Sequence, residues 1–189
     1  MASPNLSNPN NSELYHFISW TPPSDQSWRI NFAGYVNGSK KAGAGCILRD
    51  QNAKFKAACA VPVMNCNNLV GAELTGLKHG LVMAIKQGVD YLEIEGDYSP
   101  AMRLLFGEVS IPLSSKIYQL VDHCSYLLNQ FRSVKIREVN IDINSGANEV
   151  ATIGICLKNP KQWLDEPPSE ISEILITDVI GRKIYKFMP

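Results

Sequence analysis

The stretch RINFAGYVNG, residues 29–38, decides the interpretation of this sequence. From Trp28, just before the stretch, large apolar side chains alternate with small or polar ones. Trp28, Ile30 and Phe32 are the large apolar residues, and Arg29, Asn31 and Ala33 lie between and after them. A period of two is that of a strand with one face on a core. Because the glycine and lysine sequence VNGSKK follows, the stretch predicts a strand that enters a tight turn.

Two more strands follow this turn at short spacing. AGAGCILRD, residues 42–50, predicts the second strand. After a turn at residues 50–52, KFKAACAVPV predicts the third. Because connections this short join neighbouring strands, the three form an antiparallel meander.

The hydrophobic period then becomes helical. Apolar side chains at helical spacing predict a helix that ends at Gly88: Val70, Leu74, Leu77, Leu81 and Ile85. Gly76 and Gly80 lie on the same side of this helix as Glu73, so it can approach a sheet closely. YLEIEG, residues 91–96, predicts a fourth strand, parallel to its neighbour through a right-handed crossover.

The remaining elements complete a layered α/β architecture. We expect four of them: a short helix over 99–106, a longer helix over 113–131, a fifth strand at 134–141 and a final helix at 147–157. The fold class is α/β, with a five-stranded mixed sheet (an antiparallel three-strand meander plus two parallel strands) flanked by helices. The chain divides into three expected parts: a disordered lead-in at 1–19, the domain at 20–157 and a C-terminal extension at 158–189.

Composition limits the possible functions. The chain has 189 residues, of which 45% are hydrophobic and 19% charged, as in a globular protein with a sizeable core. Its 18 basic residues balance 18 acidic ones, so no global field attracts nucleic acid or an anionic membrane. Any binding to nucleic acid therefore has to come from a local patch.

The cysteines and the N-terminus indicate a reducing compartment. Five cysteines, at 46, 59, 66, 124 and 156, lack zinc-ligand spacing and are expected to be buried thiols. The N-terminal sequence has no basic and apolar pattern of a secretory signal, and no apolar run reaches the about 20 residues of a membrane span. We expect a cytoplasmic or nuclear protein with no membrane partner.

Several short motifs carry a family resemblance. In order, they are W-x-P-P at 20–23, INFAGYVNG, AGAGCILRD, AEL at 72–74, IEGD at 94–97 and SGANEVA at 145–151. Their order and spacing resemble plant ribonuclease H-like domains, the group related to reverse-transcriptase-associated ribonuclease H. The match covers about residues 20–157, and Trp163 with the pair Pro167 and Pro168 resembles extensions found in that family. The resemblance implies the ribonuclease H-like fold.

The resemblance also implies a mechanism. Ribonuclease H cuts the RNA strand of an RNA/DNA hybrid with two Mg²⁺ ions held by four carboxylates. Glu73 matches the helix glutamate of that set, and Asp97 matches the aspartate that follows the fourth strand. Ala33 and Thr152 stand where the family has its two other aspartates. The chain is therefore expected to keep two metal ligands, Glu73 and Asp97, and to hold Mg²⁺ weakly or not at all.

Nearby positions depart from the family pattern as well. Tyr98 replaces a small serine, Asp142 a frequent histidine and Ser145 a frequent arginine, while Asn148 keeps the register. These changes favour natural degeneration over a laboratory substitution at Ala33 alone.

Single carboxylates have alternative roles that the sequence leaves open. Asp142 or Glu95 could substitute as a ligand, although we expect Glu95 to be a partly exposed strand residue. Glu73 could instead stabilise a helix N-terminus, and Asp97 could cap the helix that follows it.

Three functions follow as hypotheses. The first is a catalytically impaired or inactive module that still binds an RNA/DNA hybrid, with contacts from Asn37, Lys40, Lys41 and Asn148. The second is a scaffold that binds a protein partner and no nucleic acid. The third is an active Mg²⁺-dependent hybrid ribonuclease, or an engineered inactive mutant of one. A lysine pair in a turn is also consistent with a solvated sheet edge.

Overall fold

The computed structural model describes residues 15–64, 68–97, 99–110, 112 and 115–185. In chain order its elements are β1 (Tyr15–Ile18), β2 (Ser27–Val36), β3 (Ala42–Arg49), β4 (Phe55–Val63), α1 (Leu69–Lys86), β5 (Tyr91–Gly96), α2 (Ser99–Leu105), α3 (Lys116–Leu128), β6 (Ser133–Glu138), α4 (Ser145–Ile155), β7 (Lys161–Leu164), α5 (Ser169–Ile180) and β8 (Arg182–Tyr185).

The main sheet has the order β6-β5-β2-β3-β4-β7. Strands β2, β3 and β4 form the predicted antiparallel meander, and β5 and β6 run parallel to β2. The sheet has six strands where we predicted five, because β7, in the extension past residue 157, pairs with β4. Its sequence KQWL is too short and too polar to show a strand period.

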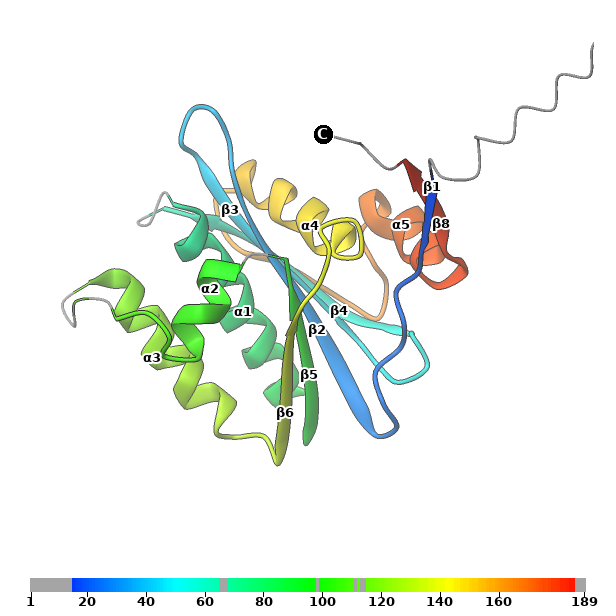
Figure 1. Cartoon of the computed structure of the whole chain (residues 1–189). Coiled ribbons are helices and arrows are strands. Elements are labelled where there is room, and N and C mark those ends of the chain that lie inside the picture. The colour runs from blue at the N-terminus through cyan, green and yellow to red at the C-terminus, as the bar shows by residue number, and fades with distance from the viewer. Residues whose placement is uncertain (1–14, 65–67, 98, 111, 113–114, 186–189) are drawn as a thin grey trace, which may run out of the picture.

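Helices cover both faces of this sheet (Figure 1). Helices α1, α2 and α3 lie on one face, where Ile30 and Phe32 of β2 join the larger core with Leu77 and Leu81 of α1. Helices α4 and α5 lie on the other face, where Ile47 packs with Val150 and Ile171. Alternate residues of β2 and β3 thus serve two separate cores.

Small residues bring one helix on each face very close to the sheet. A Cβ added at Gly45 of β3 would lie 2.3 Å from the backbone nitrogen of Ala151 in α4. A Cβ added at Gly76 of α1 would lie 2.9 Å from the carbonyl oxygen of Ala33. The close approach predicted from Gly76 is therefore confirmed, and β2 and β3 are held tightly between α1 and α4.

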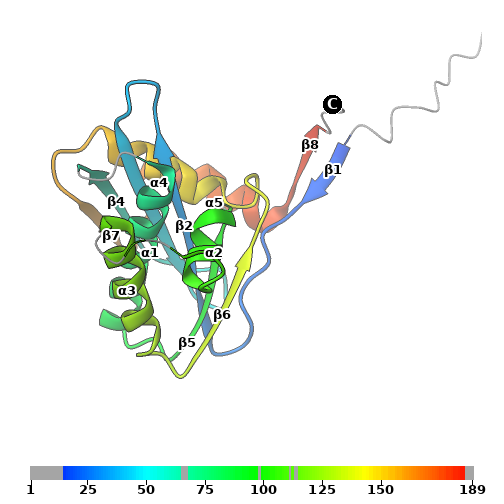
Figure 2. The same ribbon diagram turned by 60° about the vertical axis from the view of Figure 1, so that its left-hand side comes forward.

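A second, two-stranded sheet projects beside the main one (Figure 2). It pairs β1 with β8 antiparallel, with Tyr15 opposite Tyr185 and Ile18 opposite Arg182. The expected disordered lead-in at 1–19 is wrong for residues 15–18, because these form β1 with a partner strand near the other end of the chain. Residues 1–14 lie outside the described part of the chain.

Most of the described cysteines are buried free thiols. Cys46, Cys59 and Cys124 are free and buried as predicted, Cys156 is free but exposed, and Cys66 lies outside the described residues. No helix among the described residues is long and apolar enough to cross a membrane.

Candidate functional site

The positions that the resemblance singles out lie near the ends of parallel strands. Because β2 and β5 run in the same direction, their carboxyl ends meet at one edge of the sheet. Ala33 lies in the last half of β2, and Asp97 follows β5 directly. Glu73 comes from α1 on one face of the sheet, and Thr152 comes from α4 on the other.

Ala33 lies in an apolar cluster. It is fully buried and packs with Ala147 and Ala151 of α4, which are also buried. Ala33 is the position at which the resemblance implies an anionic ligand, and none of these three methyl groups offers an oxygen to a cation.

Glu73 is a buried carboxyl that contacts β2. Only 2% of it is exposed, and Oε1 accepts a hydrogen bond from the backbone N–H of Gly34 at 2.8 Å. Burial raises the pKa of Glu73 well above its usual range, the charge of Asp97 raises it further, and the Gly34 hydrogen bond opposes them. Oε2 is buried and has no hydrogen-bond partner among the described residues.

Helix capping does not explain Glu73. The N-cap of α1 is Asn68, whose side chain accepts a hydrogen bond from the backbone N–H of Gly71 at 2.7 Å. Glu73 is beyond the first turn of α1, which contains no acidic residue. The helix N-terminal role considered for Glu73 is therefore wrong.

Two asparagine side chains hold the carboxylate of Asp97. Oδ1 accepts a hydrogen bond from Nδ2 of Asn144 at 2.6 Å, and Oδ2 accepts one from Nδ2 of Asn148 at 3.0 Å. Asn144 also donates to the carbonyl oxygen of Phe32 at 2.8 Å, which ties the clamp to β2. Asn148, predicted as a nucleic-acid contact, therefore supports Asp97 in this structure.

Thr152 is bonded within its own helix. Its side chain is exposed, and its hydroxyl donates to the carbonyl oxygen of Asn148 one turn earlier at 3.1 Å. Asp142 lies in the turn before α4, where its backbone N–H donates to Oδ1 of Asn140. Ser145 is the first residue of α4, and Tyr98 lies outside the described residues.

Glu95 is more deeply buried than we predicted. We predicted a partly exposed residue, but Glu95 is only 1% exposed. Its Oε2 accepts hydrogen bonds from Asn31 Nδ2 at 2.8 Å and Trp20 Nε1 at 3.1 Å. Its Oε1 forms ion pairs with Arg29 at 3.1 Å and with Arg137. Because all these partners already occupy both oxygens, Glu95 is not available as a substitute metal ligand.

The polar cluster around Glu95 extends to the C-terminal helix. Arg49 Nη2 donates to Asn31 Oδ1 at 2.9 Å, and Arg49 Nη1 forms an ion pair with Asp178 of α5 at 3.1 Å. The guanidinium carbon of Arg49 lies 3.4 Å from the ring centroid of Trp20. Burial lowers the pKa of Arg49 to about 10, although the charge of Asp178 opposes this shift. We call Trp20, Arg29, Asn31, Arg49, Glu95 and Asp178 the buried polar cluster.

This cluster had a partial signal in the sequence. Arg29 and Asn31 occupy the polar positions of β2, and the parallel register sets Asn31 beside Glu95 and Arg29 beside Glu93. Arg29 and Ser24 donate to Glu93, and although burial alone would raise its pKa, these hydrogen bonds lower it to about 2. The sequence of one strand alone does not show which residues of the neighbouring strand lie beside it.

The hairpin that carries the two predicted lysines is held by Asn37. Its Oδ1 accepts hydrogen bonds from the backbone N–H groups of Ser39 at 3.1 Å and Lys41 at 3.0 Å. Asn37 therefore shapes the turn, in which Lys40 has a positive φ of 60°. The side chains of Lys40 and Lys41 are exposed.

The carboxylates do not fit a pair of Mg²⁺ ions. The described residues contain no group of three or more Asp, Glu, His or Cys side chains that could hold a metal. The two oxygens of Asp97 face amide N–H donors, which repel a cation, and the raised pKa of Glu73 favours its neutral form. Two dications need several anionic oxygens between them.

The fold defines a ribonuclease H-like domain. Ribonuclease H1 from the halophilic archaeon Halobacterium salinarum NRC-1 has a similar structure, with a TM-score of 0.63 and 21% identity over 69% of this chain and 98% of that one. The N-terminal RNase H domain of a Mycobacterium tuberculosis protein has a TM-score of 0.63 and 20% identity over 69% and 94%. LC11-RNase H1, solved in complex with an RNA/DNA hybrid, has a TM-score of 0.60 and 14% identity over 68% and 96%.

The sequence comparison then gives the family. A family model described as reverse transcriptase-like matches residues 31–154, so the chain belongs to the reverse transcriptase-like family. No curated protein matches the sequence.

Proposed function

We propose that this domain binds nucleic acid, with an RNA/DNA hybrid as the first candidate, and does not cleave it. The observation that carries the proposal is the state of the two remaining carboxylates. Glu73 is buried against Gly34, and Asp97 is held between Asn144 and Asn148. The similarity to LC11-RNase H1, which was solved with an RNA/DNA hybrid, supports the choice of ligand.

The loss of cleavage follows from electrostatics. In two-metal hydrolysis, one ion activates the attacking water and the other stabilises the leaving oxygen. Ala33 and the exposed hydroxyl of Thr152 contribute no negative charge, so the repulsion between two dications would remain almost uncompensated. In this proposal Mg²⁺ binds weakly or not at all.

Cleavage and binding should be measured in the same samples. A labelled RNA/DNA hybrid is incubated with Mg²⁺ or Mn²⁺ and with either the unaltered protein or the double variant Ala33→Asp/Thr152→Asp. We expect binding without cleavage for the unaltered protein. Cleavage above a heat-inactivated control would instead establish an active hybrid ribonuclease with a different ligand set. Cleavage by the double variant alone would show that these two positions were sufficient to end catalysis.

An exposed apolar face supports a second candidate, a scaffold for a protein partner. Phe17 is 66% exposed beside the end of α5, where Ile176 is 61% and Ile180 is 71% exposed. Large apolar side chains gathered on one surface are typical of interaction sites. If the protein does not bind the hybrid in the assay above, this candidate replaces the first.

We also propose a cytoplasmic or nuclear location. The free thiols of Cys46, Cys59 and Cys124 support a reducing compartment. Fractionation of cells that express the tagged full chain would test the location.

A further inference from the structure

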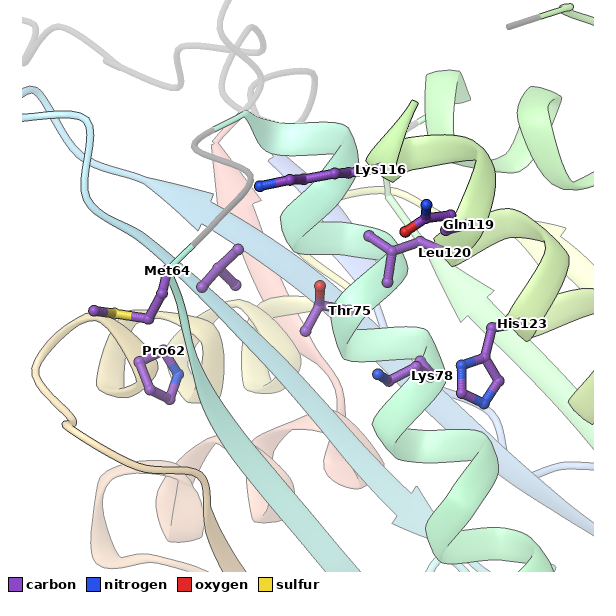
Figure 3. A pocket seen from close by; sticks show the side chains of 9 residues that line it. Pro62, Met64, Thr75, Lys78, Lys116, Gln119, Leu120 and His123 are labelled. Carbon is purple, nitrogen blue, oxygen red and sulfur yellow. The ribbon is translucent and has the colours of Figure 1, made fainter. Parts of the chain in front are cut away.

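Two hollows flank the carboxyl end of β4. Each has a volume of about 440 Å³, and the two share the lining residues Pro62, Val63 and Met64. The first hollow lies between β4, α1 and α3 and is also lined by Thr75, Lys78, Lys116, Gln119, Leu120 and His123 (Figure 3). The second lies between the β2–β3 hairpin and the end of α4 and is also lined by Ser39, Lys40, Lys41, Ala42, Ile155, Leu157 and Lys158. We call the two together the β4-end groove.

The β4-end groove is basic. Five lysines line it, from four different parts of the fold: Lys40, Lys41, Lys78, Lys116 and Lys158. No aspartate or glutamate is among the described residues that line it. In the part of the chain that the structure describes, Lys40, Lys41, Lys78 and Lys158 form no ion pair. A protein with equal numbers of basic and acidic residues therefore concentrates positive charge here.

The groove also crosses a sheet edge that is open but blunted. Strand β7 pairs with β4 only from Ala57 to Ala60, so among the described residues no strand covers the outer edge of residues 61–63. Pro62 lies in this edge and has no backbone N–H. Proline in an edge strand is tolerated where the missing donor faces away from the sheet, and it disfavours pairing with another protein strand.

The groove lies at the end of the sheet where β2, β4 and β5 all terminate, which is also the end with the carboxylates. Strand β4 is antiparallel to β3, and β3 is antiparallel to β2, so β4 runs in the direction of β2 and β5. The carboxyl end of β4 is therefore at the edge where Asp97 follows β5. A ligand that follows this edge meets the lysines without needing the metal ligands that Ala33 and Thr152 fail to supply.

We propose that the β4-end groove binds the phosphate backbone of nucleic acid. This inference rests on the proposed function and specifies the surface that carries it. Lysines on both sides of the strand end provide charge for successive phosphates, and the apolar side chains of Pro62, Val63 and Met64 form the surface between them. Because contacts between lysines and phosphates carry no sequence information, binding should depend on salt and little on sequence.

A pair of charge-matched variants tests the groove. Lys41→Glu/Lys158→Glu reverses two charges in the groove, and both side chains are exposed, so the fold should be unaffected. The control Lys54→Glu/Lys86→Glu makes the same change in net charge at two exposed lysines outside the groove. Fluorescence anisotropy of a labelled single strand, DNA duplex and RNA/DNA hybrid, each about 30 nucleotides long, is recorded at several salt concentrations, with poly-glutamate of equal length as a competitor.

The groove variant should bind at least about tenfold more weakly than the control, and its salt dependence should fall by about two ion equivalents. Equal affinities of the two variants would overturn the groove assignment while leaving nucleic-acid binding by the protein intact. No binding by the unaltered protein would overturn the proposed function itself. Competition by poly-glutamate as effective as that of unlabelled nucleic acid would show that the groove takes an acidic protein segment and would overturn the choice of ligand.

Discussion

Asn31 and Ala33 are two residues apart on β2 and face the same side of the sheet, yet their surroundings differ completely. Asn31 belongs to the buried polar cluster, where every member bonds to another residue of that cluster. Ala33 packs against the methyl groups of Ala147 and Ala151 in its apolar cluster. One region holds buried charges in fixed pairs, and the other holds only methyl groups.

The difference shows how a buried charge is kept. In the interior, arginines and hydrogen-bond donors compensate the carboxylates of Glu95 and Asp178. In an active ribonuclease H the metal ions would compensate the carboxylates of the centre. A carboxylate at buried position 33 would have no such counterpart among the methyl groups around it, whereas alanine needs none.

The buried polar cluster should give the largest effect. Asp178→Ala leaves the guanidinium of Arg49 buried without its anion, and breaking a buried pair in this way costs about 3–5 kcal/mol. Urea unfolding measures the loss. The control Glu108→Ala breaks the pair with Arg103, in which both side chains are more than half exposed, and should cost at most about 1 kcal/mol. Equal losses in the two variants would contradict a stabilising role for the cluster.

A charge introduced into the apolar cluster should destabilise the protein. Ala33→Asp places a carboxylate among buried methyl groups and should lower the free energy of unfolding by about 1–3 kcal/mol. Ala33→Ser, which adds only a neutral hydroxyl, should lower it less. Because Glu73 and Asp97 are already engaged, Mg²⁺ should not restore the stability of Ala33→Asp. Recovery in Mg²⁺ would show that the centre still assembles around a cation.

Glu73 should make the free energy of unfolding depend on pH. Its folded-state pKa is raised by burial, so the native state binds this proton more tightly than the unfolded state, whose pKa is about 4.3. The native state therefore loses stability relative to a non-titrating side chain as pH rises above the unfolded pKa and through the folded one. Glu73→Gln keeps an acceptor for Gly34, and in urea titrations its stability relative to the parent protein should increase as the pH rises above the unfolded-state pKa. A gap that stays constant with pH would show that Glu73 is compensated in the folded protein.

The smallest effect is expected at Thr152. Its side chain is exposed and bonds within α4, so Thr152→Asp should change the free energy of unfolding by no more than about 0.5 kcal/mol. Isothermal titration with Mg²⁺ should detect no new site in this single variant. A new site would mean that Asp97 can leave Asn144 and Asn148 for a metal.

Much of the fold follows from local patterns. Alternation in β2, β3 and β4 and the helical period of α1 each act within one segment, and their predictions are confirmed. The four-residue strand β7 was missed because it carries no period and is defined by its partner β4. Strand β1 was missed for the same reason, since its partner β8 lies at the other end of the chain.

For the candidate site as well, local motifs could be predicted and contacts between distant segments could not. The motifs around Glu73 and Asp97 single out two positions, and in the structure Glu73 lies on α1 and Asp97 follows β5. The burial of Glu95 was not predicted because a polar position on a strand normally indicates solvent. Its surroundings come from Trp20, Asn31 and two arginines on other segments. The amide clamp on Asp97 likewise requires the turn before α4 to meet the end of β5.

The pairing of β1 with β8 has a consequence for the order of folding. Tyr15 and Tyr185 are opposite each other, so forming this small sheet closes a loop of nearly the entire described chain. Loop closure becomes less favourable as the loop lengthens, and an isolated pair of strands is marginally stable. We therefore expect these strands to join only after the main sheet has formed and to open first. In hydrogen exchange their amides should lose protection long before those of β2 and β3.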